Sequence, residues 1–250
     1  MNIFAISDLH MSIANPKHMD IFGTKWNNYL EKIASDWQER VTDDDVVIIA
    51  GDISWAMNTE DALKDFEFFK NLKGKKIFIR GNHDYWWKSI TRLREQVPED
   101  CYLLQNDAIK IGNKVFCGSR CWITPGSPDF KQADQKIYLR ELERLKIAFF
   151  RANQLREESD ELICILHFPP FNVHRDDNEV TALMSDNNVN AVIYGHFHTG
   201  FIENIDGVTV ANAGSLSLPK NGTPNSFMTL ENGVLILKDL DGKVIKETNI

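Results

Sequence analysis

The sequence contains no run of eighteen apolar residues, so it predicts no helix that crosses a membrane. The chain reaches its first apolar run at Ile3, which leaves no room for a signal peptide ahead of it. The cysteines lack the spacing of a zinc ribbon or a CxxC motif, and no two of them are adjacent in the sequence. They are Cys101, Cys117, Cys121 and Cys164. Such cysteines are typical of reduced core residues, and we therefore expect a cytoplasmic protein.

An excess of basic residues is also missing. The net charge of −8 disfavours stable binding to long nucleic acid duplexes, whose phosphates attract basic surfaces. Basic residues do gather at 73–76 and 140–146, but acidic or apolar residues interrupt them, which favours solvated surface over a binding patch. With 250 residues, 43% of them hydrophobic and 26% charged, the chain can bury a large core. Because no linker, repeat or low-complexity segment interrupts it, we predict one domain over residues 1–250.

Polar residues that commonly bind metals follow five apolar, strand-like runs. The residues are Asp8 and His10 after Ile3–Ile6, Asp52 after Val46–Ala50, Asn82, His83 and Asp84 after Ile77–Arg80, His167 after Leu162–Leu166, and His196 and His198 after Ala191–Tyr194. Parallel strands that are buried on both faces read as continuous apolar runs, and ligands bind beyond their carboxyl ends. Carboxylate, amide and imidazole groups hold divalent metals. One such residue alone would usually be an ordinary loop residue, but their repetition predicts a shared metal site.

The spacing inside these motifs also fits a metal site. Asp8 and His10 are two residues apart, as are His196 and His198, and in an extended segment such pairs point to the same side. Glycine precedes three of the motifs, at positions 51, 81 and 195, where a sharp turn is easiest for glycine. Each pair can therefore grip one metal ion or two adjacent ones.

In their order along the chain, these motifs resemble the signature of the calcineurin-like metallophosphoesterase family. The matching segments are Asp8-x-His10, Gly51-Asp52, Gly81-Asn82-His83-Asp84, His167 and Gly195-His196-x-His198, and they extend from residue 8 to residue 198. The resemblance implies an α/β (α+β) fold of two facing mixed β-sheets flanked by helices, in four αββα layers. It also implies an enzyme that hydrolyses phosphate esters at a two-metal site.

The resemblance gives each of these residues a role. It implies a first metal ion on Asp8, His10 and His198, a second on Asn82, His167 and His196, and Asp52 as the bridge between them. His83 corresponds to the family's catalytic or phosphate-contacting histidine, and Asp84 to the carboxylate that orients it. An ordinary ligand role for His83 and a structural turn role for Asp84 stay open. Mixed nitrogen and oxygen ligands suit manganese, iron, zinc, cobalt or nickel, so the sequence does not fix the two divalent ions.

The chemistry of these residues supports the same roles. Two divalent ions roughly 3.5–4 Å apart clamp the attacking and leaving oxygens of an in-line displacement and activate a bridging water. Only Asp8 and Asp52 are anionic ligands, so about two positive charges remain to attract a phosphate. His83 could stabilise that phosphate or protonate the leaving alkoxide, with Asp84 fixing its tautomer.

The sequence departs from the protein Ser/Thr phosphatases of the family. Those carry a further Asp-Arg-Gly whose arginine binds phosphate, whereas here Asp52 is followed by Ile53-Ser54-Trp55. We therefore expect a phosphodiesterase that acts on a small, nucleotide-like phosphate ester and is activated by manganese. The alternative is a phosphomonoesterase acting on small molecules. A non-catalytic metal-binding scaffold is less favoured, because every ligand position and His83 are kept.

Three irregular stretches, at 11–25, 118–130 and 168–175, are expected to form the rim of the site. Three of their residues are candidate contacts to a phosphate or ribose: Arg120, His174 and Arg175. Trp55, Trp86 and Trp87 lie next to the metal motifs and are candidates for the pocket wall, although packing is the commoner role of an aromatic residue.

The remaining scaffold is predicted from periodicity and turn signals. Apolar residues at spacings of three and four predict helices at 26–37, 62–72, about 85–97 and 134–157. Short strands are expected between 101 and 117, with a turn at Gly112-Asn113. Turn signals at Asp206-Gly207, Asn232-Gly233 and Asp241-Gly242 predict a C-terminal meander that completes the second sheet.

Overall fold

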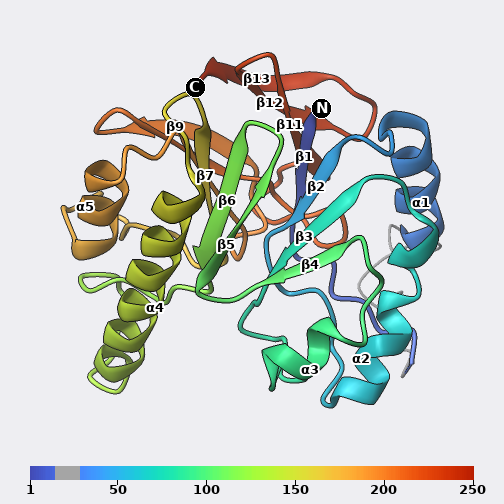
Figure 1. The fold of residues 1–250 in the computed structure, drawn as a ribbon, viewed down its shortest axis with the longest axis horizontal. Helices are drawn as coiled ribbons and strands as arrows, with labels where there is room; N and C mark the ends of the chain where they lie inside the picture. Colours follow the sequence, from blue (N-terminus) through green and yellow to red (C-terminus); the bar gives the residue numbers. More distant parts are fainter. Residues whose placement is uncertain (15–28) are drawn as a thin grey trace.

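The apolar runs of the sequence form the central strands of two sheets that face each other (Figure 1). The computed structural model describes residues 1–14 and 29–250. The first sheet contains, in spatial order, β13 (Val244–Asn249), β12 (Val234–Asp239), β11 (Ser226–Glu231), β1 (Ile3–Ile6), β2 (Val46–Ile49), β3 (Lys75–Ile79) and β4 (Cys101–Leu104). The second contains β5 (Asp107–Ile111), β6 (Lys114–Ser119), β7 (Glu161–Leu166), β8 (Ala191–Tyr194), β10 (Val208–Asn212) and β9 (Phe201–Ile205).

The central strands are buried on both faces because their side chains alternate between two layers of core. In β1, Ile3 and Ala5 pack between the sheets, in a cluster that also holds Ile163 of the second sheet. Phe4 and Ile6 point to the outer face, where the helices lie. The strands β1, β2, β3 and β4 pair in parallel, as do β6, β7 and β8, so their carboxyl ends lie at one edge of each sheet.

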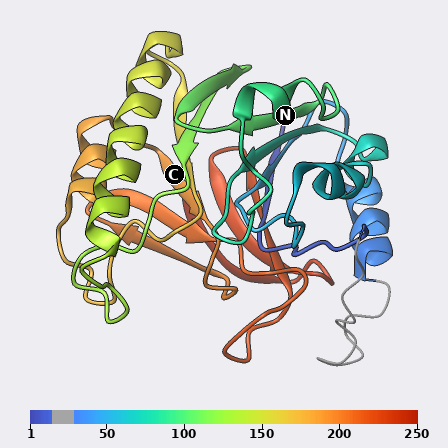
Figure 2. The ribbon, with the colours of Figure 1, turned by 90° about the horizontal axis from the view of Figure 1, so that it is seen from below.

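Helices cover the outer faces of both sheets, as Figure 2 shows from below. The first sheet is covered by α1 (Tyr29–Arg40), α2 (Thr59–Phe66), the 3₁₀ helix η3 (Phe69–Asn71) and α3 (Ile90–Arg94); the second is covered by α4 (Asp134–Leu155) and α5 (Glu179–Asp186). These layers confirm the predicted αββα architecture. Among the described residues, no helix combines the length and the apolar character that crossing a membrane requires.

Three helices differ from the prediction. The helix predicted at 62–72 is observed as α2, which ends at Phe66, followed by the separate 3₁₀ helix η3. The third predicted helix begins at Ile90 rather than near Tyr85, because Trp86 and Trp87 are buried in loop conformation instead of lying on a helix face. The short helix α5 was not predicted, although Asn178 and Thr181 cap its first turn reciprocally. The predicted helix at 26–37 is observed from Tyr29 onward. Its first predicted residue, Trp26, and most of the rim stretch 11–25 lie outside the described residues.

The prediction that the C-terminal meander completes the second sheet is wrong for its last three strands. The hairpin β9–β10 does join the second sheet, beside β8. However, β11 pairs antiparallel with β1, with Ile3 opposite Leu230, and carries β12 and β13 into the first sheet. Turn residues determine which strands form hairpins. They do not determine which sheet edge receives the hairpin, and here that edge is the side of β1 not used by β2.

Candidate metal centre

The loops that follow β1, β2, β3, β7 and β8 meet where the carboxyl ends of the two sheets come together. Backbone hydrogen bonds join these loops. The backbone N–H of Asp8 donates to Gly51 O at 3.1 Å, and the backbone N–H of His10 donates to Asp52 O at 3.0 Å. Gly195 N donates to His167 O at 3.3 Å within the second sheet. The sequence motifs, far apart along the chain, therefore form one cluster.

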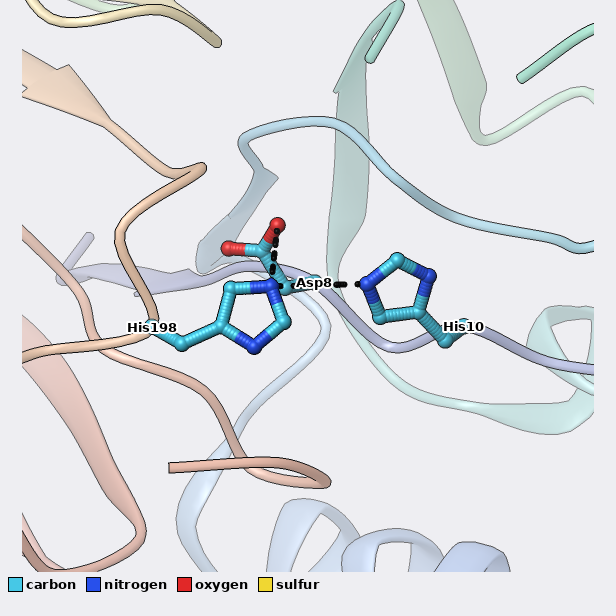
Figure 3. Close-up of side chains that lie close together, drawn as sticks. All are labelled: Asp8, His10 and His198. Carbon is cyan, nitrogen blue, oxygen red and sulfur yellow. Dashed lines mark hydrogen bonds and ion pairs between the residues drawn. The ribbon is translucent and has the colours of Figure 1, made fainter. Parts of the chain in front are cut away.

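A first group of ligand atoms comes from Asp8, His10 and His198 (Figure 3). His198 Nε2 lies 3.3 Å from Asp8 Oδ1 and 3.5 Å from His10 Nε2. All three side chains are buried, and their ligand atoms lie within 4.8 Å of one another. His198 Nδ1 bonds the carbonyl of Leu218 at 2.8 Å, which turns Nε2 inward, as in histidines that bind metals.

A second group of ligand atoms surrounds the side-chain oxygen of Asn82. Asn82 Oδ1 lies 2.8 Å from His167 Nε2 and 3.1 Å from His196 Nδ1. His167 Nδ1 bonds the carbonyl of Ala50 at 2.9 Å, so its Nε2 faces the cluster. These three residues are the set that the resemblance implied for a second ion.

Asp52 lies between the two groups. Its Oδ1 is 3.5 Å from His167 Nε2, and its Oδ2 is 3.8 Å from His10 Nε2. Ligand atoms of Asp8, Asp52 and His167 also lie within 4.8 Å of one another. One carboxylate thus reaches both groups, which is the arrangement that a bridging ligand requires.

Most of these residues have an unusual backbone conformation. Asp8, His10, Asp52, His196 and His198 have φ angles of 55°, 49°, 50°, 69° and 58°. Residues other than glycine rarely adopt this left-handed region, and each costs about 1–3 kcal/mol when held in a sparsely populated conformation. Such strain persists only where the surroundings enforce it, and it gathers at functional sites.

Glycine is required beside these residues for steric reasons. Gly51 has φ +91°, and an added Cβ there would overlap the His167 ring. At Gly81 an added Cβ would overlap the carboxylate of Asp52. The glycines noted in the sequence therefore allow the close approach of loops from different strands.

The electrostatics of the cluster fit a cation. Burial lowers the pKa of His10 and of His196 to about 3, so both imidazoles are neutral, the form that binds metals. Burial and the charge of Asp8 raise the pKa of Asp52 to about 7, which reflects crowding of negative charge. The pKa of Asp8 falls to about 2: burial acts to raise it, but the imidazoles of His198, His167 and His10 outweigh that effect.

Two buried side-chain atoms of the candidate ligands also lack hydrogen bonds. Although His198 Nε2 is close, Asp8 Oδ1 accepts no well-aligned hydrogen bond, and His10 Nδ1 has no partner among the described residues. Buried polar atoms are rarely left in this state. An unsatisfied carboxylate oxygen beside imidazole nitrogens matches the donor set of a divalent transition metal.

His83 lies at the mouth of the cluster. Its side chain is 36% exposed, with Nε2 4.0 Å from Asp52 Oδ2. Trp55 forms the wall beside it, with its ring 4.7 Å from the His83 ring and 4.5 Å from the ring of His10. His83 is therefore more exposed than His10 and Asp52, and the Trp55 ring lies close to the rings of both His10 and His83.

Asp84 forms no hydrogen bond with His83 among the described residues, and its role in orienting His83 stays a prediction. Its buried carboxylate accepts hydrogen bonds from Ile53 N at 2.9 Å, Ser54 N at 3.1 Å and Gly81 N at 2.7 Å. A further bond comes from Trp86 Nε1 at 3.1 Å. Both oxygens are thereby committed to the loops after β2 and β3, so Asp84 positions the loops that carry Asp52 and Asn82.

The predicted rim residues do not converge on the cluster. Arg120 Nη2 lies 3.0 Å from the buried Glu141. Arg175 pairs with Glu203 at 3.0 Å, and His174 is exposed. Within the described part of the chain, no side-chain hydrogen bond or ion pair links the three to the candidate ligands. Trp86 and Trp87 belong to the core.

The loop after β10 contributes residues that the sequence did not reveal. Ser215 Oγ and Ser217 Oγ donate to Asp8 O at 3.1 Å and 2.7 Å, which supports the unusual backbone of Asp8. The Lys220 N–H donates to His198 O at 3.0 Å. Serine and lysine in a loop carry no distinctive local signal, so only their spatial position reveals them.

Comparison with known proteins identifies the family. The model of the calcineurin-like phosphoesterase family matches residues 1–200. No curated protein matches the chain. Among solved structures, GAP50, the anchor in the inner membrane complex of Plasmodium, superposes with a TM-score of 0.61 at 13% identity, over 100% of this chain and 88% of that one.

Two further structures share the fold. The phosphoesterase Yfce from E. coli has a TM-score of 0.52 at 16% identity over 100% of both chains. The phosphopantetheinyl hydrolase of Mycobacterium tuberculosis has a TM-score of 0.52 at 15% identity, over 86% of this chain and 90% of that one. At these identities the structures show the fold, and the family model shows the relationship. The chain therefore belongs to the calcineurin-like phosphoesterase family, a family of hydrolases that act on phosphate esters.

Proposed function

We propose that this protein is a phosphodiesterase that works with two divalent metal ions. The observation that carries the proposal is the position of Asp52, whose two oxygens face the group of Asp8, His10 and His198 on one side and His167 on the other. Asn82 and His196 complete the second set of ligands. Manganese is the first ion to test, and iron, zinc, cobalt and nickel suit the same donors.

Each protein group has a part in this proposal. When bound, the two ions supply a hydroxide nucleophile and the positive charge that polarises the phosphate. Asn82 and the neutral histidines bring no charge, so Asp8 and Asp52 leave about two positive charges for the substrate. His83, at the mouth, stabilises the phosphate or gives a proton to the leaving oxygen. Asp84 acts through the loops it holds.

The preference for a diester rests on the loop after Asp52. The segment Ile53-Ser54-Trp55 binds Asp84 through two backbone N–H groups and stacks Trp55 on His10. This segment contains no arginine that could bind the second negative charge of a phosphate monoester. A phosphate diester carries a single negative charge and does not need such an arginine. The alternative is a phosphomonoesterase that acts on small molecules. A non-catalytic metal-binding scaffold is less favoured, because the chain keeps every candidate ligand.

The activity test compares bis-p-nitrophenyl phosphate with p-nitrophenyl phosphate at one pH and fixed metal loading. We expect higher kcat/KM on the diester. Asp52→Asn should abolish both activities and lower the metal content, while Asp43→Asn, in an exposed turn, should change neither. A clear preference for the monoester across several metals would establish the phosphatase instead. Turnover of neither ester by protein with two bound metals would support the scaffold.

We also propose a cellular compartment, a domain organisation and a substrate class for this protein. Four free, buried cysteines support a reducing compartment, for which we propose the cytoplasm. The core shared between the two sheets supports a single domain over residues 1–250. We propose a small, nucleotide-like phosphate ester as the substrate.

A further inference from the structure

Arg80 occupies an unusual position beside the metal centre. It directly follows β3 and precedes the Gly81-Asn82-His83 loop, and its side chain is partly buried. Its Nε is fully buried and has no hydrogen-bond partner. Across residues 1–14 and 29–250, the side chain of Arg80 forms no hydrogen bond and no ion pair. A buried guanidinium nitrogen without a partner is costly, because it loses water without gaining another acceptor.

Glu141 of α4, whose charge acts on Arg80, already pairs with other arginines. Glu141, 1% exposed, lies 2.8 Å from Arg144 Nη1, 3.0 Å from Arg120 Nη2 and 3.4 Å from Arg140 Nη2. Burial lowers the pKa of Arg80, and the charges of Arg144 and Arg140 lower it further, against the opposing effect of Asp84 and Glu141. The charges of four arginines, Arg80 among them, thus act on one another near two carboxylates, Asp84 and Glu141, which leaves an excess of positive charge.

The second of these carboxylates cannot serve Arg80 either. Asp84 directs its hydrogen bonds to Ile53, Ser54, Gly81 and Trp86, as described above. Arg120 repeats the pattern of Arg80, since its Nε is also buried without a hydrogen-bond partner. We call Arg80, Arg120, Arg140 and Arg144 the arginine cluster. It retains unused donors in a chain whose overall charge is −8.

The arginine cluster is continuous with one wall of the metal centre. The carbonyl of Arg120 accepts hydrogen bonds from His167 N at 3.2 Å and Phe168 N at 3.0 Å. The guanidinium of Arg120 lies 4.5 Å above the Trp122 ring, which is 4.7 Å from that of Phe168. Phe168 in turn lies 4.3 Å from the ring of His196. The helix α4, which carries Arg140 and Arg144, runs along β5 and β6 beside this wall (Figure 1).

We propose that the arginine cluster binds a second phosphate group of the substrate, separate from the ester that reacts at the metal centre. Guanidinium groups hold phosphate through paired, charge-assisted hydrogen bonds, and Arg80 has its donors free for this. A phosphate there would offset the excess charge that the protein itself leaves uncompensated. The inference rests on the proposed phosphodiesterase function and narrows its substrate to diesters that carry another phosphate. The sequence alone favoured solvated surface for the basic residues at 140–146, whereas this proposal assigns Arg140 and Arg144 to a binding site.

The kinetic test uses the manganese-loaded enzyme and two matched substrates, thymidine 5′-(p-nitrophenyl phosphate) with and without a 3′-phosphate. We expect the 3′-phosphate to raise kcat/KM about tenfold or more in the wild type, as one charge-assisted interaction can. Arg80→Gln should bring that ratio close to one, and Arg80→Lys should restore part of it. Lys136→Gln, an exposed change on α4, the helix that carries Arg140 and Arg144, should leave the ratio intact.

A structural test is independent of turnover. Crystals of the metal-loaded protein are soaked in selenate, an oxyanion located by its anomalous scattering, and we expect a selenium peak beside Arg80 that Arg80→Gln removes. Selenate only at the metals overturns the proposal. Selenate at Arg80 with equal kcat/KM on both esters overturns the assignment to substrate. If neither ester is hydrolysed, the proposed function fails, and with it this assignment, even where selenate binds.

Discussion

The carboxylate of Asp84 accepts a hydrogen bond from the backbone N–H of Gly81 at 2.7 Å, and through this bond it holds the loop that presents Asn82 and His83. The other oxygen of Asp84 binds the loop that follows Asp52. One buried side chain thus ties the loop that follows Asp52 to the loop that carries Asn82 and His83. The arrangement makes Asp84 a positioning residue for two loops.

Asp84→Asn should destabilise the protein as well as reduce activity. An amide offers only one oxygen to four donors, so at least one buried N–H loses its acceptor, which costs about 1–3 kcal/mol. Denaturant unfolding and metal content measure the effect, with Asp43→Asn as the control. A variant with full stability and metal content but low kcat would instead support the predicted role of Asp84 in orienting His83.

His83→Ala should keep both metals and lose roughly 10²–10⁴-fold in turnover. Diesters with a p-nitrophenolate leaving group should lose less than 3′,5′-cyclic nucleotides, because the poorer alkoxide leaving group needs a proton. Metal analysis and kcat on both substrates provide the measurement, with His174→Ala as a comparison at an exposed histidine. Equal losses on both substrates would limit His83 to electrostatic contact, and loss of metal would make it a ligand.

The metal-free protein should become less stable, relative to Asp52→Asn, as the pH rises from about 4 to 8. The folded-state pKa of Asp52 is raised to about 7 from 3.8, so protonated Asp52 favours the folded state and ionisation opposes it. Other groups titrate in the same window, and the difference between wild type and variant isolates Asp52. The melting temperatures of both chelator-treated proteins across this range provide the measurement. Parallel curves would show that Asp52 is not crowded by negative charge.

Ser217→Ala should weaken metal binding without touching a ligand. Ser217 Oγ donates to Asp8 O at 2.7 Å and supports the left-handed backbone of Asp8, at φ 55°. Groups that orient metal ligands typically contribute 10–100-fold in affinity, and we expect a loss of about tenfold. Metal titration of the two proteins measures it, with exposed Ser159→Ala as the control. Unchanged affinity would mean that Ser215, which also bonds Asp8 O, is sufficient.

The sequence by itself determined the strands and the residues that follow them. The five apolar runs became buried parallel strands, because a segment that is apolar on both faces is stable only between two covering layers. Their carboxyl ends then had to meet, and the predicted ligands came together. Turn residues such as Asn232-Gly233 fixed the hairpins in the same local way.

Only the tertiary structure decided which distant groups share an environment. The edge of β1 received β11, the carboxylate of Asp84 accepted the N–H of Gly81, and Arg80 Nε was left without a hydrogen-bond partner. Each outcome depends on packing between segments far apart in sequence. Local propensity does not encode such contacts, because the same residue types satisfy many local conformations and only the completed core selects among them.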